Sequence, residues 1–181
     1  MFIQLSKKDK ASICKGLEQY LSLKRMLARC GKNAILCECF QKKYDGFYRV
    51  RRDQDWRKQY FKWMYEHFDT NPSFEEVLRA LNSFEKTGGK IEASFASKLL
   101  HTLNNDLPIW DSKVMAKMKQ FGVVKKTTFR SIKECVDAYE SICKWYRSID
   151  VNLYVDCFNC EFKSVDISDT KKADFILWGI E

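Results

Sequence analysis

Hydrophobic residues recur every three or four positions along most of this chain, a pattern typical of amphipathic helices. The same spacing predicts a first helix over about residues 11–29, and another that begins near Asp53 and turns Trp56 and Tyr60 inward. The longest run predicts a helix with one face on the core; it consists of Ile132, Cys135, Val136, Tyr139, Ile142, Cys143, Tyr146 and Ile149.

Capping residues and glycines predict further helix ends. The segment "NPSFEEVLRALNSFEK" offers Asn71 or Ser73 as an N-cap, places acids in the first turn and runs out before two glycines. The next predicted helix has Phe95, Leu99 and Leu103 on one face. After "DLPIWDSKV", another helix should turn Val114, Met115, Met118 and Phe121 inward, and "FILW" near residues 171–180 predicts a buried last helix.

Strand patterns are short and isolated. "GFYRVRR" and "VNLYVDCF" alternate briefly, but neither lies beside a tight hairpin signal. We therefore predict an all-α fold in a single domain of residues 1–181. The domain could divide into a lobe of residues 50–125 and a second lobe made by the N- and C-terminal helices.

Composition narrows the class of protein. With 181 residues, of which 45% are hydrophobic, the chain can bury a proper core. No apolar run approaches the roughly 20 residues that cross a membrane, and "MFIQLSKKDK" lacks the apolar stretch of a signal peptide. We expect an intracellular protein, in the cytoplasm or the nucleoid, without a membrane partner.

The eight cysteines are expected to be reduced thiols, because a chain of this size folds without disulfides. Most of them read as small apolar residues on helices, and we expect neither a metal nor a cofactor. One alternative stays open. Cys37 and Cys39 together with Cys157 and Cys160 could supply four thiolates to zinc.

The net charge is +8, and basic residues crowd into one stretch, in which aromatic rings alternate with cations. Cations that meet phosphates and rings that stack on bases suit a nucleic-acid surface, so DNA is the expected partner; a solvated basic face is the alternative. The cations are Lys42, Lys43, Arg49, Arg51, Arg52, Arg57 and Lys58, and the rings are those of Tyr44, Phe47, Tyr48, Trp56 and Tyr60.

Asp111 in "DLPIWDSKV" stands where the next helix should begin. A carboxylate at an N-cap accepts backbone N–H bonds and is favoured by the helix dipole, which explains an aspartate without any chemistry. The order of elements around it resembles the helix-hairpin-helix DNA glycosylase superfamily, which includes endonuclease III, the adenine-mismatch glycosylase and 8-oxoguanine glycosylase. The similar pieces, within residues 84–122, are Gly88 and Gly89, Ala96 in "SFASKLL", and Pro108 and Asp111 in "PIWD". The closing "ADFILWGIE" also looks like the family's terminal helix.

The resemblance implies a two-lobed helical fold that flips a damaged or mismatched base and cleaves its N-glycosidic bond. Asp111 would be the catalytic carboxylate, and Trp110 and Ser94 would line the base pocket. The residues implied to hold DNA are Gly88, Gly89, Lys90, Arg49, Arg51, Arg52, Lys113 and Lys117.

The chain departs from the family's pattern at three places. Where the family hairpin has Gly-apolar-Gly, this chain has Lys90, Ile91 and Glu92, and the lysine used for Schiff-base chemistry is replaced by Ser94. A four-cysteine iron-sulfur loop is missing too. An enzyme of this kind would therefore be monofunctional. A catalytically inactive nucleic-acid-binding module and a helical protein-interaction module are the alternatives.

Overall fold

The computed structural model describes residues 3–84, 90–162 and 165–180, and within these ranges every regular element is helical, as predicted. None of the helices described is both long and apolar enough to span a bilayer. The α-helices are α1 (Lys7–Cys30), α2 (Glu38–Tyr48), α3 (Gln54–Glu66), α4 (Phe74–Ser83), α5 (Ala93–Leu103), α6 (Ser112–Gln120), α7 (Ile132–Tyr146), α8 (Asn152–Glu161) and α9 (Asp169–Gly179), with 3₁₀ turns at Gly31–Leu36 and Ile149–Val151.

Side-chain caps set where several helices begin. Ser73, one of the two residues expected to cap α4, forms a capping box with Glu76: its hydroxyl accepts the Glu76 N–H, and the Glu76 carboxylate accepts the Ser73 N–H. Asp53 and Asp111 cap α3 and α6 through their carboxylates. The residues that determine where these helices begin therefore lie within one turn of each cap.

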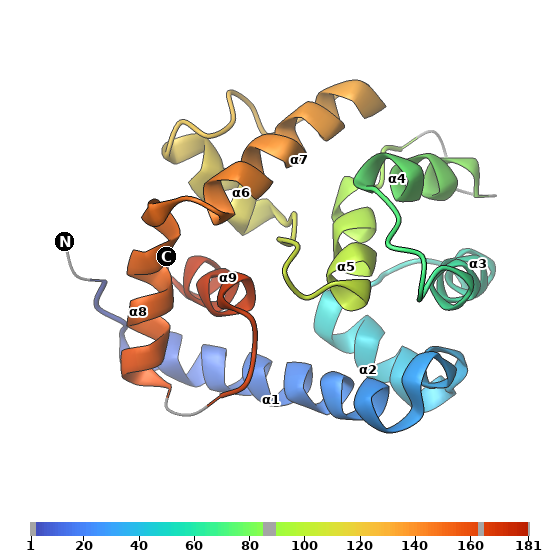
Figure 1. The fold of residues 1–181 in the computed structure, drawn as a ribbon, viewed down its shortest axis with the longest axis horizontal. Coiled ribbons are helices and arrows are strands. Elements are labelled where there is room, and N and C mark those ends of the chain that lie inside the picture. Colours follow the sequence, from blue (N-terminus) through green and yellow to red (C-terminus); the bar gives the residue numbers. More distant parts are fainter. Residues whose placement is uncertain (1–2, 85–89, 163–164, 181) are drawn as a thin grey trace.

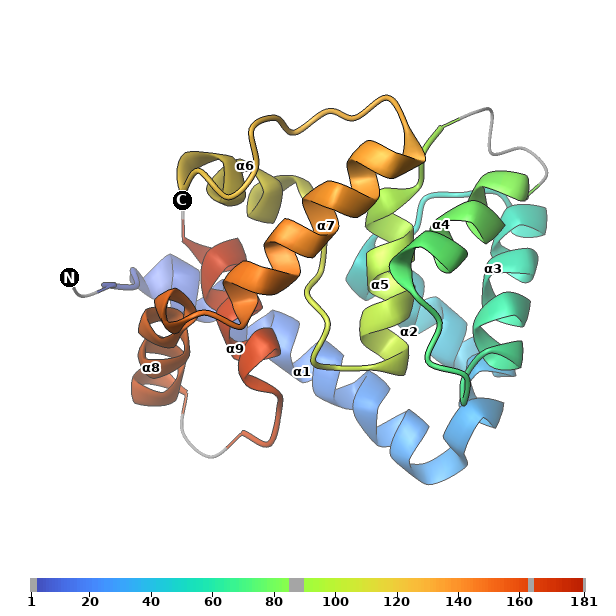
Figure 2. The ribbon, with the colours of Figure 1, turned by 45° about the horizontal axis from the view of Figure 1, so that its top comes forward.

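The helices form two groups joined by α1 (Figure 1). Helix α1 runs along one side of the molecule and packs against both α2 and α9. Helices α2 to α5 gather at one end of the molecule, while α6, α8 and α9 lie at the other, where α9 contacts both α6 and α8. Helix α7 crosses between the groups and packs on α4 (Figure 2).

The last helix is buried, as its apolar sequence predicts. Phe175, Ile176 and Leu177 of α9 are all in the core. Gly179 lies so close to α1 that a Cβ atom there would stand 2.7 Å from Cδ1 of Ile13. The glycine therefore permits a close approach of the two helices.

Both segments with alternating patterns contribute to helices, "GFYRVRR" to the end of α2 and "VNLYVDCF" to α8, in agreement with the predicted all-α fold. Two expectations about single residues were wrong. Ile149, expected on the inner face of α7, is 81% exposed because that helix ends at Tyr146. Phe121, expected to point inward from α6, is 38% exposed and stacks on Trp145.

Candidate functional site

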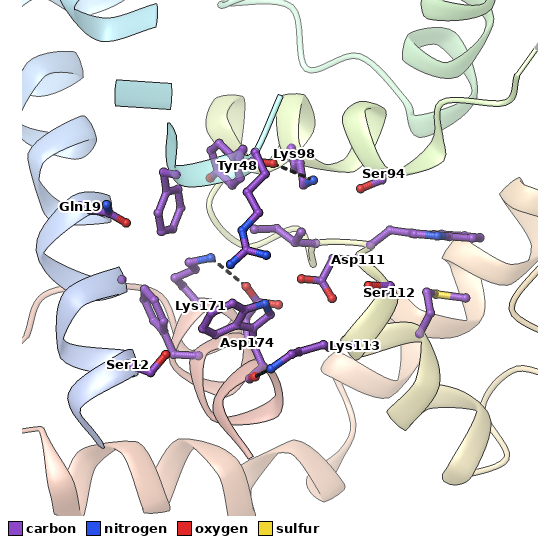
Figure 3. A pocket seen from close by; sticks show the side chains of 18 of the residues that line it. Ser12, Gln19, Tyr48, Ser94, Lys98, Asp111, Ser112, Lys113, Lys171 and Asp174 are labelled. Carbon is purple, nitrogen blue, oxygen red and sulfur yellow. Dashed lines mark hydrogen bonds and ion pairs between the residues drawn. The ribbon is translucent and has the colours of Figure 1, made fainter. Parts of the chain in front are cut away.

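A pocket of about 930 Å³ opens where α1, the end of α2, α5, the start of α6 and α9 meet (Figure 3). Apolar side chains that are buried in the core form part of its lining, namely those of Tyr48, Ile109, Trp110, Met115 and Phe175. A volume of this size lies in the range of roughly 300–1000 Å³ that is usual for small-ligand pockets.

Asp111 reaches this pocket from the residue just before α6. Its Oδ1 accepts the backbone N–H of Val114 at 2.9 Å, so the expected cap exists. The other carboxylate oxygen makes no hydrogen bond within the described residues, and Figure 3 shows the carboxylate turned into the pocket. Capping thus explains one oxygen of Asp111 and leaves the second available to a ligand.

The loop that carries Asp111 is fixed by side chains from three other parts of the chain, namely α5, α7 and the start of α9. Hydroxyl and imidazole groups donate to successive backbone carbonyls, which leaves the loop little freedom. The donors are Ser168 Oγ to Asn105 (2.6 Å), Thr170 Oγ1 to Asp106 (3.1 Å), His101 Nδ1 to Leu107 (2.7 Å) and Tyr139 OH to Pro108 (2.9 Å), while Ser97 Oγ accepts the Trp110 N–H at 2.9 Å.

His101 is fully buried and uncharged. Burial lowers its pKa to about 3, and the positive charge of Lys171 acts in the same direction. A carbonyl oxygen only accepts, so Nδ1 must carry the proton in the bond to Leu107. Nε2 lies 3.1 Å from the hydroxyl of Tyr20, which also contacts Asn105 Oδ1 at 3.1 Å. His101 therefore joins the loop before α6 to helix α1.

Lys98, on α5, extends into the same pocket. Its Nζ donates to the backbone carbonyl of Tyr48 at 3.1 Å, and in the described ranges no carboxylate lies within ion-pair distance of it. Burial lowers the pKa of Lys98 to about 8, although the nearby negative charge of Asp111 acts to raise it. Lys98 is thus a mostly buried amine that loses its proton close to neutral pH.

A second lysine of the pocket is paired. Lys171 Nζ lies 2.8 Å from Asp174 Oδ2, and both side chains are almost fully buried. Burial raises the pKa of Asp174, which Lys171 opposes, and the hydroxyl of Tyr146 also contacts this carboxylate. Because Asp174 already has a cation and a hydroxyl, Asp111 is the better placed of the two pocket carboxylates to meet a ligand.

Exposed cations surround the opening of the pocket. Lys15 comes from α1, Lys113 from α6, and Arg49 from the end of α2, where its left-handed backbone (φ 55°) terminates the helix. The indole of Trp178 lies near two of them, with its centroid 4.6 Å from Lys113 Nζ and 5.9 Å from Arg49 Cζ. With Lys98 and Lys171 added, cations outnumber the two carboxylates, which favours an anionic ligand.

The structure brings together part of the predicted site. The predicted residues that line the pocket are Asp111, Trp110, Ser94, Arg49 and Lys113. Those in the described ranges that do not line it are Lys90, Arg51, Arg52 and Lys117, while Gly88 and Gly89 lie outside the described residues.

The sequence analysis missed four charged residues of the pocket, Lys15, Lys98, Lys171 and Asp174. The spacing of Lys98 held a usable signal. It stands four residues after Ser94, and such residues lie on one face of a helix, about 6 Å apart along its axis. Lys171 and Asp174 are carried by α9, whose position no local pattern indicates.

Arg52 shows how neighbouring arginines can differ in role. It forms an ion pair with buried Glu92, and its guanidinium lies over the rings of Trp56 and Phe95 at 5.3 and 5.7 Å. The Arg52 side chain therefore makes these contacts within the fold.

Four of the five aromatic residues of the basic stretch are buried, while Phe47 is partly buried and lines the pocket. Tyr44, Tyr48, Trp56 and Tyr60 are buried, and the hydroxyls of Tyr44 and Tyr60 lie 2.9 Å apart in the core. Alternation of rings with cations in this stretch reflects amphipathic helices, whose rings face inward. The expectation of stacking rings was wrong for these four residues.

The four cysteines considered for zinc are not assembled into a site. Cys37 and Cys39 are exposed at the start of α2, whereas Cys157 and Cys160 belong to α8. In the part of the chain that the structure describes, no group of three or more His, Cys, Asp or Glu side chains could hold a metal ion.

Comparison of the chain with models of protein families, with curated proteins and with solved structures finds no match. The function has to be inferred from the chemistry of the pocket.

Proposed function

We propose that this protein removes a base from DNA by cleaving its N-glycosidic bond, with Asp111 as the catalytic carboxylate. The observation that carries the proposal is the carboxylate oxygen of Asp111 that has no hydrogen bond in the described residues and faces a pocket with a cationic opening. The resemblance of residues 84–122 to the helix-hairpin-helix DNA glycosylases supports the same chemistry.

Breaking a glycosidic bond leaves positive charge on the sugar. An ionised carboxylate close to that sugar stabilises the charge or activates a water molecule for attack. Such a group must be held in position before the reaction, because misplacement by about 1 Å costs roughly 100-fold in rate. The bonds that fix residues 105–110 supply this positioning.

The target base must leave the double helix to reach Asp111, since a stacked base is inaccessible. Trp110 offers a flat wall for it, and its indole stacks on Phe74 (6.2 Å, 13° between planes), which stacks in turn on Tyr139. Lys15, Arg49 and Lys113 at the opening would meet the phosphates on either side of the flipped nucleotide.

The proposal is tested with a panel of single- and double-stranded oligonucleotides, each carrying one modified or mismatched base. All products are heated in alkali, so that base removal is detected whether or not the protein also cuts the strand. Wild type is compared with Asp111→Asn. Asp53→Asn is the matched control, because Asp53 also caps a helix but does not line the pocket.

We expect strand breaks with wild type and Asp53→Asn, and at least a roughly 100-fold slower reaction with Asp111→Asn at undiminished DNA affinity. Turnover by Asp111→Asn at the wild-type rate would exclude Asp111 as the catalytic group. Salt-sensitive binding without any base removal would instead favour the inactive nucleic-acid-binding module. Absence of DNA binding even at low salt would favour an acidic protein partner.

A further inference from the structure

Lys98 differs from Lys171, the other buried lysine of the pocket, because it has no acidic partner. Lys171 Nζ lies 2.8 Å from Asp174 Oδ2, whereas Lys98 Nζ donates to the backbone carbonyl of Tyr48 and makes no ion pair within the described residues. An ammonium group has three N–H donors, so Lys98 has donors left for a ligand. Burying its charge is unfavourable unless an anion joins it.

A second cation lies beside Lys98. Arg49 directly follows Tyr48, whose carbonyl Lys98 contacts, and the charge of Arg49 disfavours the charged form of Lys98. The backbone of Arg49 is left-handed (φ 55°), a conformation that few residues other than glycine adopt and that recurs at ligand sites. Two like charges side by side repel each other, so this arrangement favours an anion that contacts both.

The charge of the pocket indicates how much negative charge the anion carries. Two carboxylates and five cations line the pocket, which leaves an excess of three positive charges. The cations are Lys15, Arg49, Lys98, Lys113 and Lys171. An internal phosphate of DNA carries one negative charge, whereas a phosphate monoester carries about 1.5 to 2 at neutral pH. The monoester therefore matches the pocket better.

We propose that Lys98 and Arg49 form a phosphate subsite, which holds a terminal phosphate monoester on the nucleotide whose base is removed. Two sources carry this group, a free nucleoside 5′-monophosphate and the phosphorylated end of a DNA strand. This substrate class rests on the proposed function. Asp111 lines the same pocket as Lys98 (Figure 3), so one cavity would hold both the phosphate and the sugar–base bond.

Access to Lys98 explains why the phosphate should be terminal. Lys98 is mostly buried, while Lys15, Arg49 and Lys113 are exposed at the opening of the pocket. An internal phosphate is joined to nucleotides on both sides and stays at the opening. A terminal phosphate is joined to one nucleotide only and can follow it inward to Lys98.

The reaction needs no reactant other than water. The oxygen of water bonds to C1′ of the sugar, and the electron pair of the C1′–N bond leaves with the base. The proton that water loses passes through Asp111 to the base nitrogen. The products are the free base and a sugar phosphate, and Lys98 and Arg49 form no covalent bond to either.

The test compares each of the four common 2′-deoxynucleoside 5′-monophosphates with its unphosphorylated nucleoside, using the full chain at pH 7. Calorimetric titration measures the affinity, and chromatography of the same samples detects free base. We expect at least one monophosphate to bind roughly tenfold or more tightly than its nucleoside, because charge-assisted hydrogen bonds form to the phosphate. Excess inorganic phosphate should compete with this monophosphate but not with the nucleoside.

Variants show which residues hold the phosphate. Lys98→Met should lose most of the preference for the monophosphate over the nucleoside, and Arg49→Gln should lose part of it, while the affinity for the nucleoside stays the same. Lys62→Met is the control and should keep the preference, because Lys62 is an exposed lysine of α3 that does not line the pocket. A melting temperature of Lys98→Met at or above that of wild type shows that this variant is folded.

The preference for the monophosphate should also depend on pH. Burial lowers the pKa of Lys98 to about 8, and Arg49 and Lys171 act in the same direction, while Asp111 and Asp174 oppose it. The protonated fraction of Lys98, and with it the preference of wild type for the monophosphate, should fall about fivefold between pH 8 and pH 9. Lys98→Met should not show this decrease.

Short single-stranded oligonucleotides with a 5′-phosphate or a 5′-hydroxyl distinguish the two sources of the monoester. A phosphate preference among the free nucleotides assigns the subsite to them, and a preference among the oligonucleotides alone assigns it to DNA ends; both results support the proposal. No phosphate preference in either series would overturn it. The same preference in wild type and in folded Lys98→Met would also overturn it.

Failure of this inference can be distinguished from failure of the proposed function. Phosphate preference that depends on Lys98, without release of a base from any nucleotide or oligonucleotide, would count against the proposed function alone. Base removal from DNA by a protein that shows no phosphate preference would count against this inference alone.

Discussion

His101 Nδ1 donates to the carbonyl oxygen of Leu107 at 2.7 Å, which joins a fully buried imidazole to the loop that carries Asp111. The pKa of His101 is about 3 in the folded protein, against about 6.5 in an unfolded chain. Below pH 6.5 the unfolded chain binds a proton that the folded protein does not. The contribution of uncharged His101 to the free energy of unfolding is therefore complete above pH 6.5. It falls by about 1.4 kcal/mol for each pH unit from pH 6.5 down to pH 3.

This pH dependence is measured by urea unfolding between pH 7.5 and 5. His101→Gln should show a shallower decrease in the free energy of unfolding than wild type, since it removes the group that titrates. His67→Gln is the control, because His67 is the only other histidine and does not line the pocket. Equal pH dependence in wild type and His101→Gln would mean that His101 does not cause the acid sensitivity.

Lys98 should lower the stability of the fold. Its pKa is about 8 when folded and about 10.5 when unfolded, so stability falls as the pH decreases from 10.5 to 8, and the full cost is present below pH 8. Lys98→Met removes a cost of about 3 kcal/mol and should be more stable than wild type at pH 7. The difference in the free energy of unfolding between Lys98→Met and wild type, measured by urea unfolding, should shrink at pH 10. A Lys98→Met variant less stable than wild type at pH 7 would contradict the prediction.

Arg49 and Arg52 should affect different properties when each is replaced by glutamine. Arg49→Gln removes an exposed cation beside the pocket, so DNA binding should weaken and its logarithmic dependence on salt should decrease by about one. Arg52→Gln leaves buried Glu92 without its cation and should cost about 3 kcal/mol of stability. Affinity titrations at several salt concentrations and urea unfolding of both variants distinguish these effects; an unchanged salt dependence in Arg49→Gln would place the DNA elsewhere.

Gly179 should tolerate no side chain. A Cβ atom would lie 2.7 Å from Cδ1 and 2.8 Å from Cγ1 of Ile13, so Gly179→Ala must displace this fully buried side chain at a cost of about 1–3 kcal/mol. Gly46→Ala is the control, because nothing lies within 4 Å of a Cβ atom there. Thermal unfolding measures the stability of both single variants. The double variant Gly179→Ala with Ile13→Val should recover part of the stability that Gly179→Ala loses.

Local sequence patterns were sufficient where the determining contacts lie within one or two turns. Asp111 was recognised as a cap, and Ser73 as one of two candidates with Asn71, because a cap bonds to an N–H three residues later. The run from Ile132 to Tyr146 was recognised by its spacing. The same reasoning failed at Ile149. This residue continues the spacing of apolar residues three positions after Tyr146, but the helix ends at Tyr146.

The sequence by itself determined that the chain is helical, that α3 and α4 begin near Asp53 and Ser73, and that Asp111 stands at a helix start. Only the tertiary structure decided that Asp111 and Lys98 share a pocket with Lys171 and Asp174, and that Arg49 borders it while Arg52 pairs with Glu92. Helix periodicity and capping depend on residues a few positions apart, which a sequence displays directly. The pocket depends on how α1, α5 and α9 pack together, and this follows from the shapes of buried side chains far apart in the chain.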